Sequence, residues 1–403
     1  MAKNLELYIH IPFCVRKCYY CDFLSFASDV KTQEEYTESL IREIEYYGPK
    51  MRDYHVSTIY IGGGTPTWLE ESLMLRILDA LYQNFLILDE VELSMECNPG
   101  TVTASKLAAY RRAGVNRLSI GLQSTDDEEL KILGRIHTYV QFLKTYEMAR
   151  NAGFPNINID LMSGLPYQNA QKFAKNLQQV IRLKPEHISA YTLMIEKGTP
   201  FYETYKFDAV RQEAGMKTEV LPDEDEAYRI YKVTQMILKD AGYEQYEISN
   251  YAKPGFECIH NVGYWTRENY LGLGLGAASL VENVRYLNTS DLYRYIEETK
   301  NISQSIPETS PDAIFGTNLH DSADAVLRKS QMEEFMFLGL RMTNGVTRDD
   351  FMKAFGISIE AIYQDVMIEL KNEDLLQVQN GHIFLTDKGM DLSNYVLSKF
   401  LLS

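Results

Sequence analysis

The first half of the chain alternates short apolar or β-branched runs with segments whose apolar residues recur at helical spacing. The short runs predict strands at residues 5–12, 56–61, 90–97, 117–123, 156–162 and 187–195. The intervening segments predict helices at residues 34–47, 73–85, 105–113, 140–152 and 173–183. Gly48, Gly114 and Gly153 follow three of these segments, and glycine commonly ends a helix.

Six strand–helix units in series indicate an α/β fold with a parallel sheet and helical crossovers. Six units are too few for a closed eight-stranded barrel, so we expect a partial (β/α)6 barrel. In such folds the chemistry lies at the carboxyl ends of the strands. Residues 1–200 are assigned to this barrel.

The second half changes character. A helix at 223–242, strands at 246–251 and 284–287, and a glycine-rich segment at 271–276 predict an α+β extension of the barrel over residues 201–301. Residues 302–330 are poor in apolar periodicity and contain Pro307 and Pro311, which predicts a linker or insertion loop.

The tail, residues 331–403, predicts about three helices followed by a hairpin. The hairpin strands lie at 375–378 and 383–386 and turn at Asn380-Gly381, a sequence that favours tight β-turns. This order is typical of a winged-helix-like domain. Because the tail carries eleven Asp and Glu against six Lys and Arg, we expect a packing or partner-docking domain rather than a DNA-binding one.

Charge and hydropathy exclude several classes of partner. The formal net charge of −16 argues against nucleic acid and against anionic membrane surfaces, which are bound mainly by Lys and Arg. No stretch approaches the roughly 18 apolar residues of a transmembrane helix. The start of the chain runs directly into the first predicted strand and leaves no room for a signal peptide, so a cytoplasmic location is expected.

Three of the five cysteines, Cys14, Cys18 and Cys21, lie within eight residues, whereas Cys97 and Cys258 are isolated. Disulfides rarely persist in the cytoplasm, so the triplet indicates a metal or cluster site. Three thiolates can hold three corners of a 4Fe–4S cluster and leave one iron open. The alternatives are buried, inert cysteines and a structural zinc site, although zinc normally takes four protein ligands and the nearest candidate is His10.

Further polar and glycine-rich features follow the later strands. Gly62-Gly63-Gly64-Thr65-Pro66 comes directly after the second strand, where glycines allow a ligand to approach the backbone. Polar residues at later strand ends are Glu96, Gln123, Arg135 and Asp160. A carboxylate such as Glu96 is costly to bury without a partner. Each of these features has a structural alternative, a tight turn for the glycines and an ion pair for the charged residues.

The C-x-x-x-C-x-x-C spacing after a first strand resembles the radical S-adenosylmethionine (SAM) superfamily. That resemblance implies that SAM chelates the open iron through its amino and carboxylate groups. It further implies that an electron donor reduces the cluster, which then cleaves the sulfonium to a 5′-deoxyadenosyl radical. The glycine loop would hold the amino group of SAM.

Four further segments resemble the oxygen-independent coproporphyrinogen III oxidase family. They are Tyr-Ile-His-Ile-Pro-Phe-Cys, Gly-Gly-Gly-Thr-Pro-Thr, Asn-Arg-Leu-Ser-Ile-Gly-Leu-Gln and Asn-Ile-Asp-Leu-Met-Ser-Gly-Leu-Pro. The resemblance covers most of residues 5–300. It implies that the cluster-bound SAM is lined by Tyr8, Gly63 and Glu96. The positions that hold a second SAM in the oxidases correspond to Tyr20, Gly64, Thr65, Gln123, Arg135 and Asp160.

Two departures separate this chain from the oxidases. The oxidases carry a fourth cysteine two residues after the third, where this chain has Phe23, and they carry a longer segment ahead of the first strand. In addition, residues 260–265 form an H-N-x-x-Y-W motif that resembles the heme chaperones sharing the oxidase fold. Histidine is a common axial ligand of heme iron, so His260 is the leading candidate, with Cys258 as the second. The alternative is a hydrogen-bonded core histidine.

The sequence therefore predicts a heme chaperone that carries a 4Fe–4S cluster and SAM, binds heme and passes it to acceptor hemoproteins. The first alternative is an enzyme that oxidises the propionates of coproporphyrinogen III, and the second is a radical SAM enzyme with a non-porphyrin substrate. No catalytic residue is assigned from the sequence.

Overall fold

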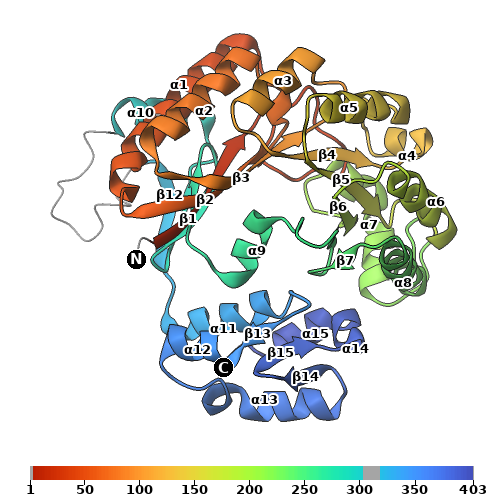
Figure 1. Cartoon of the computed structure of the whole chain (residues 1–403). Helices are drawn as coiled ribbons and strands as arrows, with labels where there is room; N and C mark the ends of the chain where they lie inside the picture. The colour runs from red at the N-terminus through yellow and green to blue at the C-terminus, as the bar shows by residue number, and fades with distance from the viewer. Residues whose placement is uncertain (1–2, 303–317, 403) are drawn as a thin grey trace.

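The computed structural model describes residues 3–302 and 318–402. Within these ranges a row of parallel strands lies side by side in sequence order and curves into a partial barrel (Figure 1). The strands are β1 (Lys3–Ile11), β2 (Tyr54–Gly63), β3 (Ile87–Cys97), β4 (Arg117–Gln123), β5 (Asn156–Ser163) and β6 (His187–Thr192). The predicted partial (β/α)6 barrel is thus confirmed.

Helices connect the strands and cover the outer face of the sheet (Figure 1). They are α1 (Val30–Tyr47), α2 (Glu71–Asn84), α3 (Ala104–Arg112), α4 (Asp127–Ile132), α5 (Tyr139–Asn151) and α6 (Ala170–Ile181), with short 3-10 turns η1 (Gly48–Met51) and η2 (Pro66–Trp68). Only α4 was not predicted. Thr138 begins α5 through a capping box with Gln141, in which each side chain bonds to the backbone of the other residue.

The barrel strands have an apolar outer face and a polar inner face. On β2, Ile59 and Ile61 belong to the main hydrophobic core, while Thr58 and Tyr60 point to the other side of the sheet. On β3, buried Leu93 alternates with inward carboxylates in the same way. Apolar burial against the helices therefore holds the barrel together, and the inner face carries its chemistry.

The extension, residues 201–301, adds strands to both edges of the parallel sheet formed by β1 to β6. Its elements are α7 (Pro200–Glu213), α8 (Glu224–Asp240), β7 (Glu244–Gln245), β8 (Asn250–Ala252), α9 (Ile259–Thr266), β9 (Tyr270–Leu273), β10 (Ala278–Val281), β11 (Val284–Asn288) and α10 (Leu292–Lys300). Strand β8 pairs antiparallel with β6, and β9 pairs parallel with β1. The predicted strand at 246–251 is wrong over residues 246–249, which lie between β7 and β8. The Glu247 carboxylate accepts bonds from Ser249 N and Asn250 Nδ2, and these bonds stabilise a turn between β7 and β8.

The predicted linker at 302–330 is only partly within the described residues, since 303–317 lie outside them. The rest does not behave as a linker, because β12 (His320–Ala325) pairs antiparallel with β11 at the edge of the sheet. Most of its side chains are exposed, so its pairing rests on backbone hydrogen bonds. That explains why no apolar periodicity marks this strand in the sequence.

The C-terminal domain has its own hydrophobic core. Its elements are α11 (Arg328–Gly339), β13 (Val346–Thr347), α12 (Arg348–Phe355), α13 (Glu360–Asn372), β14 (Leu376–Gln379), β15 (His382–Leu385), α14 (Asp387–Asp391) and α15 (Ser393–Ser398). Three helices followed by the hairpin β14–β15 form the predicted winged-helix-like arrangement. Asn380 and Gly381 both have positive φ, as the predicted tight turn requires.

Helix α9 lies between the inner face of the barrel and α11 of the C-terminal domain (Figure 1). It carries the H-N-x-x-Y-W motif. No helix in the described part of the chain is both long and apolar enough to cross a membrane.

Candidate cluster and cofactor site

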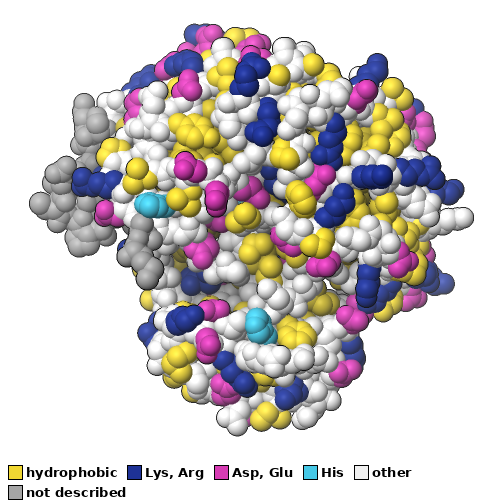
Figure 2. Space-filling view, in the orientation of Figure 1, with side chains coloured by type: hydrophobic (Ala, Val, Ile, Leu, Met, Phe, Trp, Pro, Cys, Tyr) yellow, Lys and Arg dark blue, Asp and Glu magenta, His cyan; other side chains and the backbone are white. Residues whose placement is uncertain are grey.

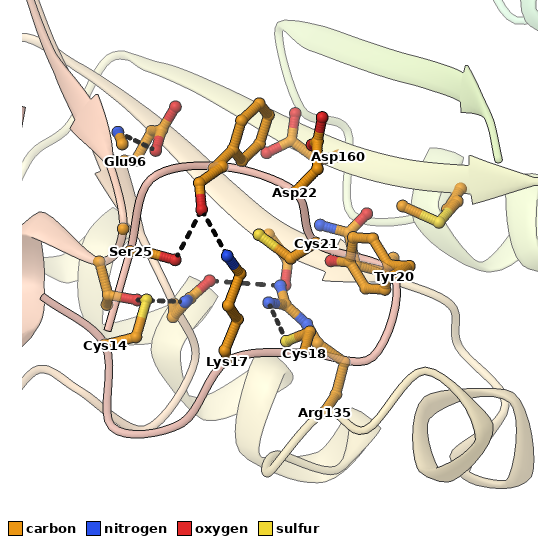
Figure 3. Close-up of a pocket in the computed structure, with 18 of the residues that line it drawn as sticks. Cys14, Lys17, Cys18, Tyr20, Cys21, Asp22, Ser25, Glu96, Arg135 and Asp160 are labelled. Carbon is orange, nitrogen blue, oxygen red and sulfur yellow. Dashed lines mark hydrogen bonds between the residues drawn. The ribbon is translucent and has the colours of Figure 1, made fainter. Parts of the chain in front are cut away.

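A pocket of about 400 Å³ opens at the carboxyl ends of the barrel strands. The loop after β1, the glycine loop after β2 and the ends of β3 to β6 surround it (Figure 3). All but two of the predicted site residues line it, namely Cys14, Cys18, Tyr20, Cys21, Gly63, Gly64, Thr65, Glu96, Gln123, Arg135 and Asp160. Arg135, which we expected at a strand end, instead follows α4. The other residues come from five strand ends and meet in one space, as the parallel topology predicts.

The three cysteines share the loop after β1, and all are free and partly exposed (Figure 3). The Cys14 Sγ lies 3.3 Å from Thr65 Oγ1, and Arg135 Nη1 donates to the Cys18 Sγ at 3.6 Å. Burial raises the pKa of the Cys14 and Cys21 thiols, so binding iron has to displace their protons.

The cysteine loop is held by two adjacent basic side chains that donate to backbone carbonyls. Lys17 Nζ donates to the Phe23 carbonyl at 2.8 Å and draws the loop around its third cysteine. Arg16 donates to the Gly134 carbonyl at 2.8 Å and ties the loop to the segment after α4. The thiols are therefore presented by a loop whose shape does not depend on a disulfide.

The donor set fits a cluster better than a single metal ion. Among the residues described by the structure, no group of three His, Cys, Asp or Glu side chains is placed to hold one ion. A 4Fe–4S cube offers each thiolate a separate iron, so its ligands need not converge on one point. His10, the other candidate for a zinc site, has both ring nitrogens hydrogen-bonded, to Tyr8 Oη at 3.0 Å and to the Leu24 carbonyl at 2.9 Å.

The three glycines at the end of β2, of which Gly62 and Gly63 belong to the strand and Gly64 follows it, are required by close packing. A Cβ on Gly64 would lie 2.8 Å from the Phe13 carbonyl oxygen, and one on Gly63, whose φ is +109°, would lie 2.5 Å from the His10 ring. A Cβ on Gly62 would lie 2.9 Å from Glu96 Oε1. The loop can thus pass between β1 and β3 with its backbone facing the pocket.

Glu96 and Asp160 are held by neutral donors rather than by cations. Glu96 accepts bonds from Tyr60 Oη and from Gly63 N, both at 3.2 Å. Asp160 accepts from Ser119 Oγ at 2.9 Å and Asn158 Nδ2 at 2.7 Å. Burial raises the pKa of Glu96 to about 7, with a further contribution from the Asp160 charge, and burial also raises the pKa of Asp160. A cationic or hydroxyl-bearing ligand would favour the charged form of both groups.

Arg135 brings a guanidinium to the opposite wall of the pocket. Its Nη2 donates to Asn98 Oδ1 at 3.2 Å and to the Gly121 carbonyl, while its buried Nε has no partner. Gln123, which ends β4, has φ +72° beside a register shift in the β4–β5 pairing. Such backbone conformations are uncommon for non-glycine residues and often occur at functional sites.

Tyr8 and His260 are the two predicted residues that do not line the pocket. The Tyr8 ring stacks on Tyr60 at 6.4 Å between centroids, and it is Tyr60 that faces the pocket. The sequence reasoning missed Tyr60, although it lies two residues before Gly62 and hence on the same face of β2.

His260 is buried on the inner face of the barrel, with 1% of its surface exposed. Its Nδ1 is 2.7 Å from Thr58 Oγ1 and its Nε2 is 3.0 Å from Tyr264 Oη. The Tyr60 ring stacks on the imidazole at 5.3 Å. Burial lowers the pKa of His260 to about 3, so the ring is neutral. In this conformation both nitrogens are engaged, as in the alternative of a hydrogen-bonded core histidine.

The two aromatic residues of the motif contact different parts of the molecule. Tyr264 lies one helical turn further along α9 and therefore contacts the imidazole directly. Trp265 faces away, toward the C-terminal domain, where Arg341 stacks on its ring at 4.4 Å. The second candidate, Cys258, is fully buried with its Sγ 3.5 Å from Glu92 Oε1, and burial raises the pKa of its thiol to about 12.

Comparison with known families agrees with this architecture. The family model described as the radical SAM superfamily matches residues 8–180, and the HemN C-terminal domain model matches residues 326–392. The first match begins within β1 and spans the cysteine loop and β2 to β5. The chain is thus a radical SAM protein.

Curated relatives narrow the class further. The chain is 36% identical to the heme chaperone HemW of Lactococcus lactis, covering 100% of this chain and 98% of the relative. It is 34% identical to HemW of Bacillus subtilis, with 98% of each chain covered. It is also 42% identical to HemW of Escherichia coli over 68% of this chain and 69% of the relative. The chain belongs to the HemW family.

Among solved structures, the chain is similar to coproporphyrinogen III oxidase (HemN) from E. coli. The TM-score is 0.82 with 24% sequence identity, covering 99% of this chain and 90% of the oxidase. This likeness shows the shared fold of barrel, extension and C-terminal domain.

Proposed function

We propose that this protein is a heme chaperone that binds heme, passes it to acceptor hemoproteins and carries a 4Fe–4S cluster with SAM. The observation that carries the proposal is its identity of 36% and 34% to two curated heme chaperones along nearly the entire length of both partners. The H-N-x-x-Y-W motif on α9 supports it from within the chain.

In this proposal Cys14, Cys18 and Cys21 hold the cluster, whose fourth iron is free for SAM. A bound cluster supplies one-electron chemistry to the sulfonium of SAM, and an external electron donor reduces it. The Glu96 carboxylate and the Gly63 backbone face the space next to the cysteine loop and would orient SAM there. The remaining charged residues, Arg135 and Asp160, would contact the far end of SAM or a second molecule of it.

His260 is the proposed axial ligand of heme. Its ring is neutral, which is the protonation state that binds iron. Its Nε2 becomes available only when the Tyr264 hydroxyl leaves it, so heme binding requires a local rearrangement of α9. Cys258 is the alternative ligand.

We further propose that the protein works in the cytoplasm. All five cysteines are free, and the three on the loop after β1 would be the ligands of an oxygen-sensitive cluster. A reducing compartment keeps such thiols available for iron.

The proposal is tested by titrating the cluster-reconstituted protein with heme and following the Soret band. We expect about one heme per chain, and we expect His260→Ala to weaken binding roughly tenfold or more, shift the band and leave iron and sulfide content unchanged. His382→Ala is the matched control, because His382 lies on the exposed hairpin of the C-terminal domain. An unchanged spectrum and affinity in His260→Ala would remove His260 as the ligand.

The transfer step is tested separately. Heme-loaded protein is mixed with an apo-hemoprotein, and the spectrum of the acceptor is followed. Transfer should convert the acceptor to its holo spectrum at a rate above that of free heme release into buffer. If wild-type protein binds no heme, or if transfer is no faster than release, the chaperone proposal is wrong.

A further inference from the structure

Helix α9 is inserted tightly into the barrel. The Glu92 carboxylate of β3 accepts bonds from Ile259 N at 3.0 Å and His260 N at 3.2 Å at the start of the helix. On the next turn Gly263 packs so closely on β1 that a Cβ there would lie 2.0 Å from Glu6 Oε1. Together with the hydrogen bond between Thr58 and His260, these contacts fix His260 against the barrel wall.

The outer side of α9 is covered by the C-terminal domain. Arg341 stacks on Trp265, and Met342 packs in the same apolar cluster as Val262. The barrel and this domain meet along a narrowed waist on the face shown in Figure 2. His260 is therefore enclosed between two parts of the molecule.

One carboxylate of the C-terminal domain, that of Glu334, bonds both to the end of α9 and to the edge of the sheet. Glu334 of α11 accepts a bond at 2.9 Å from Arg267, the residue that ends α9, and another at 3.0 Å from Arg285 of β11. The side chains of Glu334 and Arg267 are each only 10% exposed. A pair of this kind is much less screened by solvent than a surface pair.

We propose that the C-terminal domain is a lid that holds α9 in the barrel, and that heme reaches His260 only after this domain releases the helix. The inference rests on the proposed heme role of His260. A porphyrin is a rigid plate that has to place its iron on a ring nitrogen, and a side chain that is 1% exposed offers no such approach. Release of α9 supplies the rearrangement that heme binding requires.

The interface is built so that it can open. Trp265 Nε1 and Arg341 Nε are both buried at the contact and have no hydrogen-bond partner. Water would satisfy both groups in the open form, so the closed form forgoes two hydrogen bonds there. The closed and open arrangements are thereby brought closer in free energy.

The lid is tested with Glu334→Gln, which removes the charge from both ion pairs, and with Arg341→Ala, which removes the stacking on Trp265. Glu369→Gln is the matched control, because Glu369 pairs at 2.8 Å with Lys399 inside the C-terminal domain. We expect amide hydrogen exchange across residues 259–267 to accelerate in both variants without heme. Heme association measured by stopped flow should rise in both variants, and in Glu334→Gln by about tenfold, the scale of one lost charge-assisted hydrogen bond. The control should match wild type in both measurements.

Thermal unfolding and cluster content identify the variants that have kept their fold. One folded variant, either Glu334→Gln or Arg341→Ala, is enough to test the lid. Equal exchange across 259–267 in wild type, variants and control would overturn the lid, whatever the heme titration gives. Faster exchange in the variants without faster heme association, in a wild type that binds heme through His260, would also overturn it. If wild type binds no heme while α9 exchange still accelerates in both variants, the proposed function is wrong. The result would still support the inference that the C-terminal domain holds α9 in the barrel.

Discussion

At the residue scale, the cysteines and the histidine differ in how far along the chain their surroundings lie. The three thiols share one loop, so local spacing was enough to predict that they line one pocket. His260, in contrast, is bonded to Thr58, which lies 202 residues away in the sequence. No local pattern contains that contact. The resemblance to the oxidases implied Tyr8 at the cofactor site, whereas in the structure Tyr8 stacks on Tyr60 and Tyr60 lines the pocket.

Replacing Cys14, Cys18 and Cys21 together with Ala should abolish the brown absorbance of the reconstituted protein, because too few soft ligands are left. Iron and sulfide analysis measures the effect. Cys97 also lines the pocket but is buried at the end of β3 rather than on the cysteine loop, and Cys258 does not line the pocket, so changing both to Ser should leave the stoichiometry intact. Normal iron content in the triple variant, or its loss in the double one, would show that the ligands are misassigned.

Tyr264→Phe should strengthen heme binding several-fold, since the hydroxyl on His260 Nε2 competes with iron for that nitrogen and a neutral hydrogen bond contributes about 1 kcal/mol. Equilibrium titration at the Soret band measures the dissociation constant. Combining the change with His260→Ala should remove the gain. Weaker binding in the single variant would mean that the hydroxyl positions the ring for heme instead of masking it.

At the element scale, sequence periodicity predicted the barrel strands because each has a continuous apolar face that packs on helices. It missed β12 because an exposed edge strand needs only backbone partners. It also could not foresee how α1 fixes the glycine-rich segment. Buried Glu43 of α1 accepts bonds from Gly274 N at 2.8 Å, Asn288 Nδ2 at 2.7 Å and Tyr295 Oη at 2.5 Å.

Burial raises the pKa of Glu43 from 4.5 to about 7, so the folded chain holds this proton more tightly than the unfolded chain. The resulting stability is complete below pH 4.5 and is lost as the pH rises to about 7, on the order of 3 kcal/mol in total. Glu43→Gln mimics the protonated form and should reduce the loss of stability between pH 5 and pH 7. Urea unfolding of both proteins at these two pH values tests this, and parallel pH dependences would contradict it.

At the scale of the whole molecule, one architecture serves two kinds of protein, since this chain and an oxidase superpose with a TM-score of 0.82. The two sequences are nevertheless only 24% identical, and Phe23, at the rim of the pocket, has 64% of its surface exposed. On the face shown in Figure 2 acidic and basic side chains are interleaved around the waist. The shared fold therefore does not by itself transfer the chemistry.

The reconstituted protein, supplied with SAM and a reductant under anaerobic conditions, should not convert coproporphyrinogen III to protoporphyrinogen IX. The reason is Phe23, which occupies the position of the fourth cysteine of the oxidases. Chromatographic analysis of the porphyrins after reoxidation measures the product. Sustained turnover would identify the protein as an enzyme of the oxidase type.

The position of α9 in the chain has a consequence during translation, because the chain is synthesised from its N-terminus. The last barrel strand ends at Thr192, and the helix that fills the inner face begins at Ile259, about 67 residues later. At translation rates of about 5–20 residues per second, a nascent barrel spends roughly 3 to 13 s without its helix. During that interval Glu6 and Glu92 face water rather than α9. Water therefore occupies the inner face of the barrel first. It is displaced only after α9, in the second half of the chain, has been synthesised.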